Sequence, residues 1–335
     1  MIRLLTQSLK KRGDLHQKIK GGSILKKSRK DIISMRDMSK EEILHILKIS
    51  EEIENDKNKG ELLKGKIIST LFFEPSTRTR LSFQSAAQRL GAQVLGFDSP
   101  DGTSLKKGET LTDTIKMAEA YSDLIVIRHP LDGSAKLAAE TASVPVLNAG
   151  DGVNQHPSQT LLDLYTILKE KKTLENLKIA FVGDLKYGRT VHSLVKAISH
   201  FNPKIYFIAP EILRIPEYIL DDLDTLGINY EVLEDFRDCL SEIDVFYMTR
   251  VQKERFPDEE EYEKVKGVYV ISKKNILDKC KDDMIILHPL PRVDEINTDL
   301  DDTKHALYFK QAKNGVPVRE AMMLVALGIK EKIEG

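Results

Sequence analysis

A turn near residue 75 carries the run of side chains with the clearest chemical potential. It reads Phe73-Glu-Pro-Ser-Thr-Arg-Thr-Arg80, at the end of an apolar run and the start of a helical pattern. Ser76 and Thr77 fall where unpaired backbone N–H groups and the helix dipole attract an anion, and Arg78 can donate two hydrogen bonds to phosphate oxygens. The run predicts a phosphate site, but on composition alone an ordinary serine N-cap followed by surface arginines is an equal alternative.

Two further side chains stand at positions typical of ligand contacts. Arg128 follows the apolar run 124–127, and His156 lies in the polar segment 154–160. In parallel sheets, ligands bind beyond the carboxyl ends of the strands, so an arginine there is well placed to hold an anion. A histidine by itself is more often a structural residue, but the neighbouring Asn154, Gln155 and Gln159 favour a ligand-facing role for His156.

The elements that must position these residues alternate regularly. A capping box at 39–42 begins the first predicted helix, and from residue 67 apolar runs typical of strands alternate with helical patterns. The predicted strands are 67–73, 93–97, 124–127, 144–148, 177–182, 204–208, 229–233, 245–248 and 284–287. The predicted helices include 77–90, 110–121, 134–141, a long helix at 158–170, and a last apolar helix at 318–329.

This alternation predicts the α/β class, with two domains that are each a doubly wound parallel sheet flanked by helices. A length of 335 residues suits two domains, each with a substantial apolar interior. We expect a first domain at 31–157, completed by a C-terminal helix at 315–335, and a second domain at 158–314. The helix at 158–170 is long enough to bridge them.

Composition excludes several classes of protein. The chain has 51 basic and 52 acidic side chains, so no overall charge points to nucleic acid. No apolar run approaches the roughly 20 residues that cross a bilayer. Cys239 and Cys280 are far apart, without a Cys-x-x-Cys pair, so cysteine provides neither a disulfide framework nor a zinc site. We expect a protein of the reducing cytoplasm.

The first 30 residues differ from the rest in charge. They carry ten Lys or Arg side chains and one acid, Asp14. Such a segment can be an organelle transit sequence, an interaction arm or a solvated tail, and we favour the tail.

The run Ser76-Thr-Arg-Thr-Arg80 is also the phosphate-binding signature of the carbamoyltransferases. From about Asp31 to Ile333 the chain resembles the aspartate-specific catalytic chains of that family. Further matching stretches, in order along the chain, are 107–110, 128–130, 148–152, 154–160, 182–190, 248–255 and 287–295. The resemblance implies a carbamoyltransferase-like fold. It also implies transfer of the carbamoyl group of carbamoyl phosphate to L-aspartate, an early step of de novo pyrimidine biosynthesis.

The resemblance further implies which residues hold carbamoyl phosphate. The implied contacts are Ser76, Thr77, Arg78, Thr79, Arg128, His156, Gln159, Leu290 and Pro291. Of these, Arg78, Thr79, Arg128 and His156 are the implied catalytic residues. Thr79, Arg128 and His156 would face the carbonyl oxygen, where negative charge develops in the reaction. Leu290 and Pro291 would present backbone carbonyls, in a turn that proline also stiffens.

By the same resemblance, aspartate is held by Lys107, Arg189, Arg250 and Gln252. Arg189 would bind the α-carboxylate, and Arg250 with Gln252 would bind the side-chain carboxylate. Two separated guanidinium groups suit a dicarboxylate. The implied chemistry requires no metal and no organic cofactor.

The stretch 103–109 resembles a loop that reaches into a neighbouring subunit's active site, so the implied assembly is a homotrimer with shared sites. Lys107 is the matching lysine, and either Thr103 or Ser104 supplies the accompanying hydroxyl. A solvated lysine-rich turn is the plainer interpretation. The stretches 249–258 and 314–319 look most like catalytic chains that associate with a separate zinc-bearing regulatory chain, which we keep as a hypothesis. Neither nucleic acid nor a membrane is expected as a partner.

Three alternatives compete with this interpretation. An ornithine carbamoyltransferase would share the phosphate signature, but such enzymes carry His-Cys-Leu-Pro where this chain has His288-Pro-Leu-Pro291, and they lack Arg250 and Gln252 in this arrangement. A dinucleotide-binding protein would need Gly-x-Gly-x-x-Gly after a strand, which 182–188 does not supply. A catalytically inactive homologue is disfavoured because the matching residues are intact.

Overall fold

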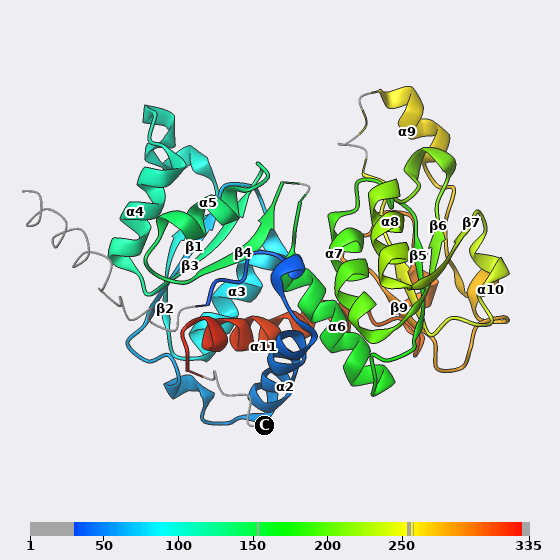
Figure 1. Cartoon of the computed structure of the whole chain (residues 1–335), viewed down its shortest axis with the longest axis horizontal. Coiled ribbons are helices and arrows are strands. Elements are labelled where there is room, and N and C mark those ends of the chain that lie inside the picture. Colours follow the sequence, from blue (N-terminus) through cyan, green and yellow to red (C-terminus); the bar gives the residue numbers. More distant parts are fainter. Residues whose placement is uncertain (1–29, 153, 253–255, 257, 330–335) are drawn as a thin grey trace, which may run out of the picture.

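The computed structural model describes residues 30–152, 154–252, 256 and 258–329. The predicted basic arm, apart from Lys30, lies outside this part of the chain. The described residues form two lobes side by side, each built on one parallel sheet (Figure 1). No helix among them is long and apolar enough to cross a membrane.

The first lobe contains a four-stranded parallel sheet in the order β2-β1-β3-β4. Its strands are β1 (Ile67–Phe72), β2 (Gln93–Phe97), β3 (Leu124–His129) and β4 (Val146–Asp151). The central strands β1 and β3 are almost wholly buried, as expected for strands covered on both faces. Their register pairs Phe72 with Arg128, so the turn after β1 lies next to Arg128, the second-to-last residue of β3.

The second lobe contains a five-stranded parallel sheet in the order β7-β6-β5-β8-β9. Its strands are β5 (Lys178–Val182), β6 (Lys204–Ile208), β7 (Asn229–Leu233), β8 (Val245–Met248) and β9 (Ile285–Leu287). The register pairs Val182 with Met248. The segments that follow β5 and β8 are therefore adjacent, and these segments carry Arg189 and Arg250.

Helices cover both sheets and join the lobes (Figure 1). The first lobe has α2 (Lys40–Asn55), α3 (Thr77–Arg89), α4 (Leu111–Tyr121) and α5 (Ser134–Thr141). The second lobe has α7 (Arg189–Ile198), α8 (Glu217–Leu226), α9 (Glu259–Val265) and α10 (Lys273–Ile276). Helix α6 (Pro157–Lys171) runs between the lobes, and α11 (Tyr308–Ala326) packs on α2, α3 and α6. The predicted class, two parallel α/β lobes flanked by helices, is confirmed.

Two predicted elements were placed wrongly. The fourth strand was predicted at 144–148 but spans Val146–Asp151, because Pro145 cannot donate to the ladder and the chain stays paired with β3 through Asp151. The last helix was predicted to begin at 318 but begins at Tyr308 and continues through Pro317. Its middle is held by packing: Asn314 donates to the Thr166 hydroxyl of α6 at 3.0 Å.

Candidate active site

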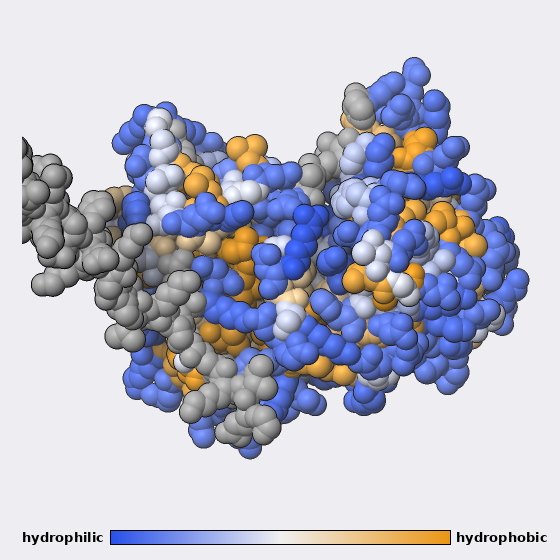
Figure 2. Space-filling view, in the orientation of Figure 1, coloured by the Kyte–Doolittle hydropathy of each residue, from blue (hydrophilic) through white to orange (hydrophobic). Residues whose placement is uncertain are grey.

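A cavity of about 500 Å³ lies between the two lobes. Figure 2 shows the notch between the lobes, bordered largely by hydrophilic residues. The cavity is lined by Glu74, Pro75, Ser76, Thr77, Arg78, Thr79, Ser82, Arg128, His156, Gln159, Leu162, Gly188, Arg189, Thr190, Thr249, Arg250, Gln252, His288, Pro289, Leu290, Pro291, Gln311, Ala312 and Arg319. Every predicted site residue except Lys107 is in this set. Their individual roles stay predictions.

Three helices begin at this cavity without a side-chain cap. They are α3, α6 and α7, whose N-cap residues Ser76, His156 and Gly188 make no capping hydrogen bond. The first backbone N–H groups of a helix have no partner within the helix, and the dipole places partial positive charge there. Three such ends around one cavity create a strongly anion-attracting space.

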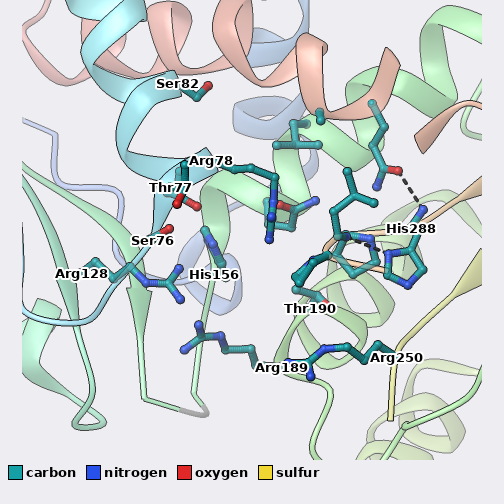
Figure 3. Close-up of a pocket in the computed structure, with 18 of the residues that line it drawn as sticks. Ser76, Thr77, Arg78, Ser82, Arg128, His156, Arg189, Thr190, Arg250 and His288 are labelled. Carbon is teal, nitrogen blue, oxygen red and sulfur yellow. Dashed lines mark hydrogen bonds between the residues drawn. The ribbon is translucent and has the colours of Figure 1, made fainter. Parts of the chain in front are cut away.

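Arginines add full positive charge to the helix ends. Five line the cavity: Arg78, Arg128, Arg189, Arg250 and Arg319. Figure 3 shows the first four, from both lobes, around the same opening. Burial lowers the pKa of Arg78, and the charges of Arg128 and Arg250 lower it further. Mutual repulsion of this kind is relieved by a bound anion, so the site favours a ligand with several negative charges.

Arg128 is held in place by the first lobe itself. Only 9% of its surface is exposed. One guanidinium nitrogen, Nη2, donates to Glu74 at 2.8 Å, and the other, Nη1, donates to the Ala149 carbonyl at 3.4 Å. The side chain is therefore oriented by contacts within the protein.

Gly150 shows how closely the two lobes approach. Its φ of 117° belongs to the region that favours glycine. A Cβ there would stand 3.3 Å from Nη1 of Arg128, 3.4 Å from Cδ2 of His156 and 3.6 Å from Nη2 of Arg189. Two first-lobe residues and one second-lobe residue thus meet around a single backbone position, and a side chain there would press against all three.

His156 is an electrically neutral donor in this setting. Burial lowers its pKa well below the ordinary value, and the charges of Arg189 and Arg128 lower it further. At neutral pH the imidazole therefore carries one N–H group and no charge. Its Nδ1 lies 3.4 Å from the Ser158 hydroxyl. A neutral imidazole can donate a hydrogen bond to a carbonyl oxygen without adding to the repulsion among the arginines.

Arg189, the first residue of α7, reaches across to the first lobe. It donates to the Gly152 carbonyl, and its Nη2 lies 3.8 Å from the Glu74 carboxylate. Glu74 therefore contacts arginines of both lobes. It is the one acidic side chain among the cavity-lining residues that the structure describes. This carboxylate offsets part of the positive charge of the two arginines.

The segment after β8 forms the far wall. Thr249 donates to the Val182 carbonyl at 3.0 Å, which ties this segment to the end of β5. Gln252 donates to the Tyr187 carbonyl at 3.4 Å. Arg250 lies between them and is partly buried. Figure 3 shows Arg250 and Arg189 on the same side of the opening.

The turn after β9 closes another side of the cavity. Nδ1 of His288 accepts from the Leu290 N–H at 2.8 Å, and Nε2 of His288 lies 2.7 Å from the Glu295 carboxylate. Leu290 has a φ of 56° and is followed by a cis peptide bond to Pro291. The turn is held from within by His288, which sequence reasoning did not single out.

Lys107 is the predicted site residue that the structure does not bring to the cavity. It ends the short 3₁₀ helix Ser104–Lys107, beside the start of α4, and it is exposed. The preceding Thr103 hydroxyl donates to the Pro100 carbonyl at 2.7 Å. Lys107 does not line the cavity of its own chain, and its role stays a prediction.

Several lining residues were not predicted. Glu74 and Thr190 lie within two residues of predicted site residues, so including the sequence neighbours of those residues would have found them. Arg319 is harder, because it lies on α11, almost 200 residues further along the chain than Arg128. The available signal was a charged pair, Arg319 and Glu320, inside the otherwise apolar run 316–326; both side chains are buried.

Metal ligation is not indicated by the geometry. Within the described part of the chain, no group of three or more His, Cys, Asp or Glu side chains could hold a metal ion.

Two models of one protein family match the chain, one for each lobe. The family model described as "Aspartate/ornithine carbamoyltransferase, carbamoyl-P binding domain" matches residues 30–169. The model of the "Asp/Orn binding domain" of the same family matches residues 175–326.

Individual relatives agree with these matches. The chain is 58% identical over 308 residues to the aspartate carbamoyltransferase catalytic subunit of Brachyspira hyodysenteriae, covering 91% of this chain and 86% of that protein. It is 55% identical to the corresponding subunit of Thermococcus kodakarensis, covering 90% and 97% of the two chains.

Solved structures place the fold in the same group. The catalytic subunit of M. jannaschii aspartate transcarbamoylase superposes with a TM-score of 0.84 at 53% identity, covering 90% of this chain and 99% of that one. The Trypanosoma cruzi aspartate transcarbamoylase, in complex with carbamoyl phosphate and aspartate, superposes with a TM-score of 0.83 at 36% identity, covering 88% and 95%. The chain belongs to the aspartate/ornithine carbamoyltransferase family, and its nearly full-length relatives are catalytic subunits of the aspartate enzyme.

Proposed function

We propose that the chain transfers the carbamoyl group of carbamoyl phosphate to the amine of L-aspartate, giving N-carbamoyl-L-aspartate and phosphate. The observation that carries this proposal is the convergence of arginines from both lobes on one cavity at three uncapped helix starts. Such a cavity suits one phosphate and two carboxylates bound together.

The phosphate binds at the start of α3. Ser76, Thr77 and Arg78 all line the cavity at the uncapped start of α3, so the first backbone N–H groups of this helix and the Arg78 guanidinium can hold the dianion as it becomes a leaving group. The hydroxyl of Ser76 is not used for capping and is available to a phosphate oxygen.

The carbonyl oxygen of the carbamoyl group faces Thr79, Arg128 and His156. Arg128 is already oriented by Glu74, and His156 is neutral, so each can donate to an oxyanion without first reorganising. Gln159 and the backbone carbonyls of Leu290 and Pro291 lie at the same cavity and suit the carbamoyl nitrogen.

Aspartate binds against the second lobe. Arg189 takes its α-carboxylate, and Arg250 with Gln252 takes its side-chain carboxylate. The amine then attacks the carbonyl carbon with its lone pair and forms the C–N bond. The tetrahedral species collapses by breaking the C–O bond to phosphate, which leaves with a proton from the amine.

A side-by-side assay with L-aspartate and L-ornithine tests the proposal. We expect carbamoylaspartate formation and no carbamoylation of ornithine, because two arginines at the acceptor end repel a second amine and attract a second carboxylate. A bisubstrate analogue carrying a phosphonate and two carboxylates should inhibit. Turnover of ornithine, or of neither substrate, would overturn the assignment.

We propose further that the active form is a homotrimer in which Lys107 and a hydroxyl of Thr103 or Ser104 complete the neighbouring chain's site. The supporting observation is that Lys107 lies outside its own chain's cavity. Lys107→Ala and Arg78→Ala trimers, each inactive alone, should regain activity when subunits exchange, since mixed trimers contain one intact site. Absence of any recovery, with exchange demonstrated, would contradict shared sites.

A regulatory chain and a cytoplasmic location complete the proposal. Cys239 and Cys280 are both free thiols, which supports a reducing compartment. Association with a zinc-bearing regulatory chain is tested by adding nucleotides to the co-purified complex: sigmoidal aspartate dependence supports it, whereas an isolated trimer with hyperbolic kinetics argues against it.

A further inference from the structure

Asp163 is a carboxylate that the proposed chemistry does not use. It lies on α6, one helical turn beyond Gln159, and it has no exposed surface. It does not line the cavity. A buried carboxylate is costly unless donors surround it, so its partners reveal what it does.

Three side chains from three elements donate to Asp163. Gln159 of α6 donates to Oδ1 at 2.9 Å, and Gln311 of α11 donates to the same oxygen at 2.6 Å. Tyr247 of β8 donates to Oδ2 at 2.8 Å. The carboxylate thus connects the bridging helix with both lobes, immediately behind the cavity.

The orientation of Gln311 follows from its second partner. Its Oε1 accepts from the backbone N–H of His288 at 2.9 Å, shown as a dashed line in Figure 3. A backbone N–H can only donate, so the carbonyl end of Gln311 must face His288. The NH₂ end of Gln311 therefore faces Asp163.

The orientation of Gln159 follows from the charge of Asp163. Burial raises the pKa of Asp163 to about 7, although the hydrogen bonds from Gln311, Tyr247 and Gln159 act in the opposite direction. At pH 8 the ionised form predominates, and an ionised carboxylate only accepts hydrogen bonds. Gln159 must turn its NH₂ group toward Asp163, and its Oε1 is then the end left for the cavity that Gln159 lines.

We propose that Asp163 is a positioning residue: it holds Gln159 with a carbonyl oxygen toward the ligand, so the site selects an acyl phosphate that carries an N–H donor. This rests on the proposed function. Carbamoyl phosphate has the donor in its NH₂ group. Acetyl phosphate has a methyl group in the same place, and it leaves the Gln159 oxygen without a partner. Discrimination between the two ligands therefore depends on the amide orientation that Asp163 imposes.

The test compares three ligands in wild-type protein and in Asp163→Ala at pH 8. The measurements are the KM of carbamoyl phosphate and the inhibition constants of acetyl phosphate and inorganic phosphate. Without Asp163, Gln159 can rotate, and we expect the preference for carbamoyl over acetyl phosphate to fall about tenfold. Inorganic phosphate has no acyl group, so its inhibition constant should change less than twofold.

Two matched variants separate positioning from general damage. Asp163→Asn removes the charge but can keep an oxygen acceptor toward both glutamines, so it should restore the wild-type preference. Tyr247→Phe removes only the bond to Oδ2 and should also leave the preference intact. Loss of preference in Asp163→Asn, or an unchanged preference in folded Asp163→Ala, would overturn the proposal.

Neutron diffraction from the perdeuterated wild-type protein determines the orientation of the Gln159 amide even if Asp163→Ala does not fold. Deuterons on the Gln159 atom that faces Asp163 support the proposal, and deuterons on the cavity side refute it. Failure of the proposed function itself would look different: wild-type protein would form no carbamoylaspartate, while the neutron map would still report the orientation of Gln159.

Discussion

Helices α2 and α3 begin with the same residue type, and the two serines are used differently. Ser39 caps α2 in a full capping box: it accepts from the Glu42 N–H at 3.2 Å, and Glu42 accepts from the Ser39 N–H at 2.9 Å. Ser76 begins α3 without a capping bond, and no acid stands in the first turn of that helix. One helix start is satisfied internally and contributes stability, whereas the other leaves its donors for an anion.

Other helix starts can be compared in the same way. Helix α8 also lacks a side-chain cap, at Pro216, although it lies away from the cavity, so a missing cap alone does not mark a binding site. Helix α4 also begins with a capping box, at Thr110, and it lies away from the cavity. Helices α6 and α7 begin at the cavity and lack side-chain caps, as α3 does. A helix start that gives up its cap forgoes roughly 1 kcal/mol of stability. Where several such starts face one space, the omission indicates a binding site.

Arg78→Ala gives the sharpest test of this comparison, because Arg78 lies in the first turn of α3 and is the side chain that we assign to the phosphate. We expect turnover to fall about a thousandfold, since a charged donor in a partly enclosed site is lost as negative charge shifts to the leaving group. The measurement is carbamoylaspartate formation at saturating substrates. Arg80→Ala is the matched control: Arg80 is two residues further along α3 and pairs with Asp98 at 2.6 Å. Equal losses in both variants would refute a special role for the helix start.

Arg189→Ala tests the start of α7, which we assign to the acceptor. We expect the KM of aspartate to rise about a hundredfold, the effect of losing a charge-assisted contact to a carboxylate. The affinity for inorganic phosphate should change little in comparison. If phosphate binding weakens as much as aspartate binding, the two helix starts do not serve separate substrates.

Two serine variants, one at the start of each helix, compare α2 with α3 directly. Ser39→Ala should lower the free energy of unfolding by about 1 kcal/mol and leave turnover unchanged, because it removes only a cap. Ser76→Ala should instead lower turnover about tenfold and leave the unfolding free energy nearly unchanged, because no capping bond is lost. Urea unfolding and the activity assay provide the two readouts, and the reverse pattern would contradict the division.

The start of α6 predicts a pH effect on stability. Burial and nearby arginines lower the pKa of His156 in the folded protein, while the unfolded chain takes up the proton below about pH 6.5. The contribution of neutral His156 to the free energy of unfolding is therefore fully present above about pH 6.5 and is lost as the pH falls below that value. His156→Gln should reduce this slope by up to about 1.4 kcal/mol per pH unit. Other histidines with lowered pKa values, such as His288, will retain part of the slope. An unchanged slope in His156→Gln would mean that His156 is protonated when folded.

Secondary structure was predictable where local pattern and tertiary environment agree. The strands after residue 67 are short apolar runs bounded by turns, and apart from β4 their ends were predicted to within about two residues. The start of α11 was missed because Asn314-Gly-Val-Pro317 has the composition of a turn. Packing reverses that preference: a Cβ on Gly315 would stand 2.0 Å from Nη1 of Arg319 and 3.2 Å from Cδ2 of Leu162, so the glycine leaves the space that the buried Arg319 guanidinium occupies.

Local patterns in the chain were enough to predict the alternation of strands and helices and the anion-attracting run at 73–80, because the spacing of neighbouring residues records such features directly. The residues expected around the acceptor came from the family resemblance. By contrast, the meeting of Arg189 and Arg128 at Gly150, the presence of Arg319 at the cavity and the absence of Lys107 from it became visible only in the folded chain. The same is true of the partners of Asp163. Contacts between the lobes depend on how the two sheets are positioned relative to each other by α6 and α11. The spacing of residues along the sequence does not specify that relative position.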